Sequence, residues 1–161
     1  MTTFLSNRSI YESVICGIVP EVRERLWIAT ADIKDMYVET GGRDMVPFLA
    51  VLASLLKRGV EIRLIHAKEP GPNFRTDFDR FPILRTGLER VLCPRVHFKC
   101  VLVDGRFAYF GSANLTGAGM GAKSERKRNF ENGILTCTPA AGRLQVGQSM
   151  PRMVPFSPWS M

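Results

Sequence analysis

A histidine and a lysine two positions apart open the segment HFKCVLVDGRFAYFGSANLTG, residues 97–117. Side chains alternate across a strand, so His97 and Lys99 are predicted to share one face. The Asp-Gly pair that follows, between two apolar runs, predicts a β-hairpin. The returning strand then brings Ser112 and Asn114 beside the start of the first strand. The hairpin is therefore predicted to gather a nucleophile or base, a counter-charge for an anion and two hydrogen-bonding groups.

The spacing of these residues is more specific than any one of them. The pattern H-x-K-x4-D-x6-G-S-x-N is the signature of the phospholipase D superfamily, and the segment resembles it at every defining position. The matching residues are His97, Lys99, Asp104, Gly111, Ser112 and Asn114. Downstream, RNFENGILT resembles the final strand of that family, in which an Asn-x-Glu supplies an acidic partner, here Asn129 and Glu131. The resemblance is strong over residues 95–136, looser over 1–94, and fades after 137.

This resemblance implies phosphodiester cleavage through a covalent phosphohistidine, with no metal and no cofactor. A neutral imidazole is a competent nucleophile near pH 7, and cationic and amide groups can stabilise the charge on phosphate oxygens. The catalytic residues expected on this basis are His97, Lys99, Ser112, Asn114, Glu131 and Asp104. Asp104, at the turn of the hairpin, is expected to be structural rather than to touch the substrate.

A single histidine does not complete this mechanism, because the departing oxygen needs a proton from a second acid. Most members of the superfamily carry two copies of the motif, whereas this chain carries one. His66 lies in the tripeptide HAK but lacks the residues that should follow it. We therefore expect a homodimer in which a second copy of His97 supplies the acid.

The net charge of +7 indicates a polyanionic partner such as nucleic acid or a lipid surface. A basic cluster close to the motif consists of Lys123, Arg126, Lys127 and Arg128. These residues are expected to bind a nucleic-acid backbone, although a solvated loop explains most such clusters. Short single-motif relatives include dimeric bacterial nucleases, so a nuclease acting on DNA or RNA is favoured. A lipid phosphodiesterase or phosphatidyl transferase, and a non-catalytic nucleic-acid-binding module, remain alternatives.

A second phosphate-binding pattern fails on inspection. The stretch GAGMGAKS (117–124) imitates a P-loop, G-x-x-x-x-G-K-[ST], but Ala122 separates the glycine from Lys123. These glycines are better interpreted as a loop beside the active site.

The apolar periodicity predicts an α/β fold, a mixed sheet flanked by helices in a phospholipase D-like sandwich. Strands are expected at 25–30, 60–67, 95–103, 106–111 and 129–136. Helices are expected after Ser6 or Asn7, from Met45 to a stop at Gly59 with Asp44 as its cap, and near 83–90. Residues 68–82 are predicted to form a loop. A catalytic domain at 1–137 and an extended or partly disordered tail at 138–161 complete the organisation.

The chain has no apolar run long enough to span a membrane and no signal-peptide pattern at its start. We therefore expect a cytoplasmic protein without stable membrane association. The four cysteines are far apart, with no C-x-x-C pair, so no metal site is expected.

Overall fold

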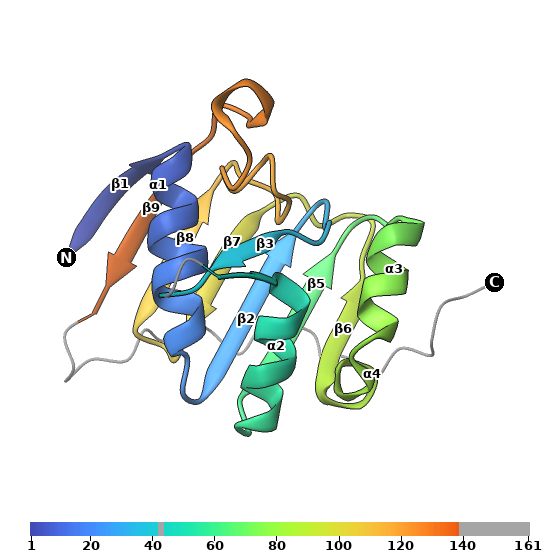
Figure 1. Cartoon of the computed structure of the whole chain (residues 1–161). Helices are drawn as coiled ribbons and strands as arrows, with labels where there is room; N and C mark the ends of the chain where they lie inside the picture. The colour runs from blue at the N-terminus through green and yellow to red at the C-terminus, as the bar shows by residue number, and fades with distance from the viewer. Residues whose placement is uncertain (42–43, 139–161) are drawn as a thin grey trace.

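A mixed sheet of seven strands forms the centre of the molecule (Figure 1). The computed structural model describes residues 1–41 and 44–138, so most of the predicted tail lies outside the described residues. In spatial order the strands are β1 (Thr2–Ser6), β9 (Asn132–Cys137), β8 (Phe107–Gly111), β7 (Lys99–Val103), β2 (Arg25–Thr30), β5 (Glu61–His66) and β6 (Leu88–Leu92). The expected mixed α/β sheet flanked by helices is confirmed.

The sheet has a parallel part and an antiparallel part, which meet between β2 and β7. Strands β2, β5 and β6 are parallel, whereas β7 runs antiparallel to β2 and is followed by the antiparallel strands β8, β9 and β1. The beginning of β7 therefore lies beside the carboxyl ends of β2 and β5. In α/β sheets, ligands bind outside the carboxyl ends of the parallel strands. The two residues before β7, which include His97, project from this end.

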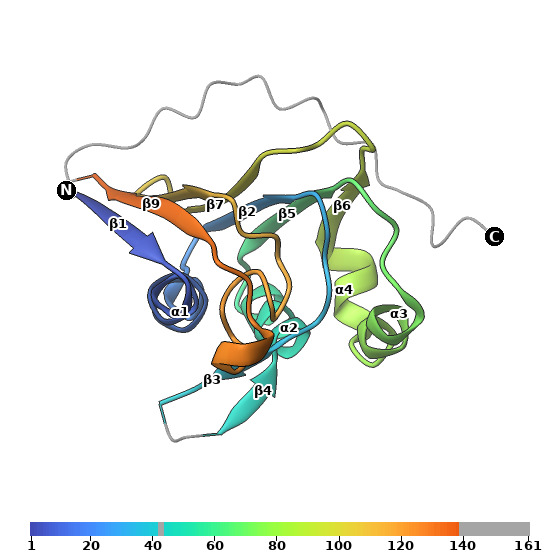
Figure 2. The same cartoon turned by 90° about the horizontal axis from the view of Figure 1, so that it is seen from above.

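The helices of the described residues lie on one face of the sheet, as Figure 2 shows from above. The first helical segment runs through α1 (Arg8–Ile10), η1 (Tyr11–Ile18) and η2 (Val19–Glu21), and it is followed along the chain by α2 (Phe48–Lys57), α3 (Pro72–Asp79) and α4 (Pro82–Gly87). A small hairpin of β3 (Tyr37–Glu39) and β4 (Met45–Pro47) precedes α2. No helix in the described part of the chain is long and apolar enough to cross a membrane.

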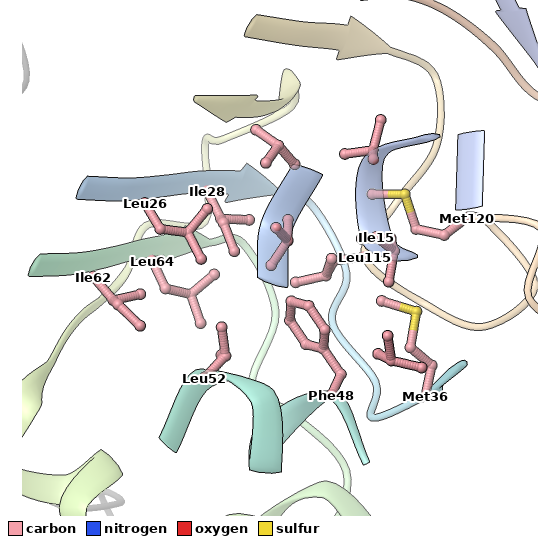
Figure 3. Packing of buried hydrophobic residues seen from close by; sticks show 14 of the residues in the cluster. Ile15, Leu26, Ile28, Met36, Phe48, Leu52, Ile62, Leu64, Leu115 and Met120 are labelled. Carbon is pink, nitrogen blue, oxygen red and sulfur yellow. The ribbon is translucent and has the colours of Figure 1, made fainter. Parts of the chain in front are cut away.

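The main core lies between the sheet and these helices. Leu26 and Ile28 of β2 and Leu64 of β5 point towards Phe48 and Leu52 of α2 (Figure 3). All five side chains are buried. Burial of each large apolar side chain contributes about 1.5–3 kcal/mol to folding. This packing fixes the sheet, and with it the strand ends that carry the site.

Helix α2 begins three residues later than the sequence predicts. Asp44 does not cap it, because residues Met45–Pro47 form strand β4 instead. The physical reason is Pro47, which disfavours a helical conformation at the residue before it and is itself extended at ψ 140°. The predicted stop is confirmed, since Gly59 has φ 85° just beyond the helix.

The region predicted to be a loop at 68–82 contains helix α3. Its apolar residues Phe74 and Phe78 are four positions apart, buried and stacked on one another, with ring centroids 6.1 Å apart. Pro72 occupies the first turn, where proline is well tolerated. The many charged neighbours hid this two-residue apolar stripe.

Two edge strands also differ from the prediction. Residues predicted to be helical at 83–90 divide into α4 and the beginning of β6, which pairs with β5. The residues of β1, which were not predicted to form a strand, pair with β9. Both strands are short and lie at the two edges of the sheet. They form because each pairs with one neighbouring strand, and their own sequences carry no strong strand pattern.

Candidate active site

The β7–β8 hairpin brings the start and the end of the sequence signature together. Lys99 pairs with Gly111 in the antiparallel register, so Ser112 lies across from the residue before Lys99. At the other end, Asp104, Gly105 and Arg106 lie between the paired residues Val103 and Phe107. Asp104 and Gly105 have φ 54° and 64°, and the Arg106 N–H donates to the Val103 carbonyl at 2.9 Å, which closes the turn. The hairpin predicted from the Asp-Gly pair is confirmed.

His97 and Lys99 lie at the open end of this hairpin. His97 is exposed, and Lys99 is half-buried. The ammonium Nζ of Lys99 donates a hydrogen bond to the backbone carbonyl of His97 at 2.8 Å and lies 3.5 Å from its Nδ1. The lysine therefore places a positive charge beside an imidazole that a substrate can reach.

Asp104 lies at the opposite end of β7, roughly 20 Å from His97 by the rise of an extended strand. Its Oδ1 accepts hydrogen bonds from the backbone N–H groups of Glu24 and Arg25, both at 2.8 Å. Its Oδ2 accepts one from the N–H of Arg23 at 2.9 Å. The structure therefore does not bring Asp104 to the other candidates. Its inclusion among the catalytic residues is corrected to a structural role, in which it ties the hairpin turn to the segment that enters β2.

Ser112, Asn129 and Glu131 form one hydrogen-bonded group beside the hairpin. The Ser112 hydroxyl donates to Oε2 of Glu131, and the Asn129 side-chain amide donates to Oε1 at 3.1 Å. The backbone N–H of Asn132 donates to the Ser112 hydroxyl oxygen at 3.1 Å. No hydrogen bond joins Glu131 to His97 among the described residues of one chain. Glu131 thus orients Ser112 here.

The glycine of the G-S-x-N segment has a steric role. A Cβ on Gly111 would lie 2.3 Å from the hydroxyl oxygen of Tyr109, and one on its register partner Gly133 would lie 2.3 Å from the Tyr109 ring. The two glycines therefore leave room for this buried aromatic ring under the site. Burial, together with the nearby carboxylate of Glu131, raises the pKa of Tyr109 to about 12.

Asn114 is oriented by residues at the carboxyl end of β2. Its Oδ1 lies 3.2 Å from the backbone N–H of Asp32, which donates to it, and 3.4 Å from the hydroxyl of Thr30. Thr30 also donates to the Asp32 carbonyl at 2.7 Å and accepts from the N–H of Leu115 at 2.9 Å. The amide oxygen is held in this way, and no described residue accepts a hydrogen bond from the amide nitrogen of Asn114, which leaves it available to a substrate.

Thr30 and Asp32 orient a residue of the site but do not belong to the sequence signature. The available signal was their position directly at the end of a predicted buried strand, where α/β proteins place ligand-binding residues.

The predicted basic cluster lies in the long connection between β8 and β9. Lys123, Arg126 and Lys127 are exposed and Arg128 is half-buried, and none of them forms an ion pair with a described residue. The connection stands beyond the end of the sheet towards which β2 points (Figure 1). Its backbone closes on the glycine-rich turn through the N–H of Asn129, which donates to the carbonyl of Ala118 at 3.0 Å. The cluster therefore lies immediately before Asn129 and Glu131 in the chain.

His66 is placed differently from His97. It is fully buried at the end of β5, its Nδ1 lies 2.8 Å from the backbone carbonyl of Lys68, and burial lowers its pKa. The expectation that His66 is a strand-end residue is confirmed. Among the described residues no three His, Cys, Asp or Glu side chains form a group that could hold a metal ion.

Comparisons with known proteins add the family. The domain family described as "Cardiolipin synthase, PLD-like domain" matches residues 20–145, which include the whole hairpin. No curated protein matches the chain significantly.

Solved structures share the fold at low sequence identity. NucT from Helicobacter pylori is 16% identical with a TM-score of 0.61, and 85% of each chain is covered. Nuc from Salmonella typhimurium, a phospholipase D family member, is 13% identical with a TM-score of 0.53, covering 85% of this chain and 84% of that one. TrmBL2, an archaeal chromatin protein that binds DNA, is 12% identical with a TM-score of 0.55, covering 84% of this chain and 45% of that one.

Proposed function

Because this chain belongs to the phospholipase D superfamily, we propose that it is a metal-independent phosphodiesterase, a nuclease that cleaves DNA or RNA through a covalent phosphohistidine. One observation carries the proposal. An exposed imidazole lies beside an ammonium group at the end of the sheet where Asn114 and the Ser112–Glu131 pair also lie. A nucleophile, a counter-charge and oriented hydrogen-bonding groups are what phosphoryl transfer requires.

The reaction follows from these groups. A neutral nitrogen of His97 attacks phosphorus, a P–N bond forms, and the P–O bond to the leaving oxygen breaks. Lys99 and the amide nitrogen of Asn114 stabilise the charge on the non-bridging oxygens. An acid protonates the leaving oxygen. Water then attacks phosphorus, the P–N bond breaks, and the group that donated its proton accepts one from the water.

The acid is proposed to be His97 of a second copy of the chain. The sequence contains two histidines, and the other one, His66, is fully buried. A homodimer with a two-fold axis beside His97 supplies the second imidazole without another motif. Sedimentation velocity should therefore detect a dimer at the concentrations at which the protein is active. A monomer that turns over normally would contradict this part of the proposal.

Nucleic acid is the proposed substrate for two reasons. The basic cluster of Lys123, Arg126, Lys127 and Arg128 continues into Glu131, and cationic side chains of this kind bind a phosphate backbone. The second reason is that TrmBL2, which is described as DNA-binding, shares this fold over part of its longer chain. Nuc and NucT share the fold over nearly their full lengths. A lipid phosphodiesterase is the second candidate, which the cardiolipin synthase description of the matching family favours.

One assay separates these functions. The purified full chain, in a chelator, is incubated with single-stranded DNA, plasmid, RNA and cardiolipin-containing vesicles. We expect cleavage of at least one nucleic acid, and a histidine-linked phosphate in the quenched protein by mass spectrometry. Hydrolysis confined to vesicles would support the lipid reading. Nucleic-acid binding with no turnover would support the non-catalytic module, and activity lost in chelator would contradict the metal-free mechanism.

Two further parts of the proposal concern the rest of the chain. The catalytic domain is proposed to span residues 1–137, with 138–161 as a tail. A cytoplasmic location without stable membrane association stays a prediction from the sequence, which cell fractionation would test.

A further inference from the structure

Asn7 lies where the chain leaves strand β1 and enters the first helix. Ser6 and Asn132 form the last register pair between β1 and β9. Asn7 has φ 49° and ψ −119°, a backbone conformation outside the left-handed helical region that L-amino acids rarely adopt. In this conformation its backbone carbonyl accepts the N–H of Ile10 at 3.1 Å and starts the helix. The carbonyl of Asn7 is therefore used by the helix and does not accept the N–H of Glu131, the residue that comes before β9 and lies opposite Asn7.

The side chain of Asn7 takes over the missing place in the strand ladder. The backbone N–H of Asn7 donates to the carbonyl of Glu131 at 2.8 Å, as in an ordinary antiparallel pair. The reciprocal bond comes from the N–H of Glu131, which donates to Oδ1 of Asn7 at 3.0 Å. Both backbone groups of Glu131 are thus held by one residue that is 124 positions away in the sequence. Asn7 consequently makes no side-chain cap to its own helix, although it occupies the cap position.

Glu131 is the residue of the site whose backbone must be fixed for its side chain to act. Its two carboxylate oxygens accept hydrogen bonds from Ser112 and Asn129. We propose that Asn7 is a positioning residue for Glu131, which aligns the Ser112–Glu131 pair with the scissile phosphate. This inference rests on the proposed function, and it identifies a residue that lies outside the sequence signature.

The glycine-rich turn holds Asn7 in place from its other side. A Cβ on Gly121 would lie 2.6 Å from the backbone oxygen of Asn7 and 3.0 Å from Cα of Arg8, so the turn packs directly against this backbone. The same turn accepts the N–H of Asn129 through Ala118. The glycine-rich turn therefore packs against Asn7 and also bonds Asn129, so it contacts both of the segments that hold Glu131. This close packing gives Gly121 a structural role, although the turn is not a phosphate-binding loop.

The chemistry of the position defines matched variants. Asn7→Gly keeps the positive φ but deletes the acceptor for the Glu131 N–H. Asn7→Asp keeps the acceptor oxygen on a side chain of the same shape. Ser9→Ala is the control at the same junction, because the Ser9 hydroxyl bonds the backbone N–H and carbonyl of Ser6, at 2.9 and 2.8 Å, and makes no contact with Glu131.

The first measurement needs no activity. Amide hydrogen exchange at Glu131, followed by NMR, should be at least about tenfold faster in Asn7→Gly than in the wild type, because the amide loses its acceptor. Exchange in Asn7→Asp and Ser9→Ala should stay close to the wild-type rate. Unchanged exchange in Asn7→Gly would overturn the role of Asn7 whether or not the protein is a nuclease.

The second measurement tests the functional consequence on the nucleic acid that the wild type cleaves best. Asn7→Gly should lower kcat by about tenfold, the scale of a small misplacement, with KM nearly unchanged. Asn7→Asp should recover most of kcat, and Ser9→Ala should keep it. Faster exchange with normal kcat would overturn the positioning role, as would equal losses in Asn7→Gly and Ser9→Ala. A wild type inactive on every phosphodiester fails the proposed function instead, and the exchange result still decides whether Asn7 holds Glu131.

Discussion

His66 and His97 each precede a lysine by two positions, yet one lies in the core and the other at the surface. The contacts within the two tripeptides are also reversed. In the first, the imidazole of His66 contacts the backbone carbonyl of Lys68. In the second, the ammonium of Lys99 donates to the backbone carbonyl of His97, which leaves the imidazole in solvent. The tripeptide alone therefore does not define a site.

The difference comes from where each histidine stands relative to its strand. His66 is the last residue of β5, a strand with neighbours on both sides, and in register it lies beside the buried Thr30. His97 precedes the first residue of β7 and so projects beyond the sheet. The imidazole is packed where the histidine is paired within the sheet, as in His66, and accessible where the histidine lies outside the paired residues, as in His97.

The largest effect should come from removing the accessible imidazole. His97→Gln should lower the rate of phosphodiester cleavage on the order of 10³-fold or more, because a nucleophile has no substitute. Its melting temperature should stay within about 2 °C of the wild type, since an exposed side chain contributes little to stability. Initial rates and thermal unfolding of the same preparations make the measurement.

The comparison with His66 supplies the control. His66→Gln should lower stability and keep most of the rate per folded molecule. If His97→Gln keeps wild-type turnover, or if the two variants lose the rate equally, the division between a catalytic and a packed histidine would be wrong.

The second effect concerns Asp104, which anchors the strand that carries His97. Asp104→Ala should lower the free energy of unfolding by about 2–3 kcal/mol, because three backbone N–H groups lose a charged acceptor at a partly exposed position. Asp104→Asn, which keeps an acceptor oxygen and tolerates positive φ, should lose less. Urea unfolding measures both. A large loss of rate per folded molecule without a loss of stability would instead return Asp104 to the reaction.

The sequence could predict the hairpin and the residues at its open end because the signals are local. An Asp-Gly turn fixes the register of two short strands, and this register brings Ser112 to the start of β7. The sequence could not predict the supports of the site. Thr30, Asp32 and Asn7 reach Asn114 and Glu131 through hydrogen bonds across 82 to 124 positions.

Local competition explains the errors in the fold. Pro47 delayed a helix that the apolar pattern alone would begin earlier, and a charged background concealed the Phe74–Phe78 stripe of α3. Edge strand β1 depends on its pairing with β9, which its own five residues do not reveal.

The smallest effect is the pH dependence of stability that the buried histidine produces. Burial lowers the pKa of His66 below its usual value of 6.5, so the unfolded chain takes up a proton in a range where the folded protein does not. Stability should therefore fall as the pH drops below about 6.5, by at most about 1.4 kcal/mol per pH unit from this group. The neighbouring charge of Arg90 acts in the same direction, whereas Glu69 opposes it.

Urea unfolding at pH 7.5, 6.5 and 5.5 isolates this contribution when the wild type is compared with His66→Gln. The comparison also removes the contribution of Asp35 to the pH dependence of stability. Burial raises the pKa of Asp35, so this residue makes the folded protein more stable as the pH falls, opposite to His66. The wild type should lose more stability than His66→Gln between pH 6.5 and 5.5, and NMR titration of the His66 ring should give a midpoint below 6.5. A midpoint at or above that value would mean that the ring reaches solvent, and the contrast between the two histidines would then disappear.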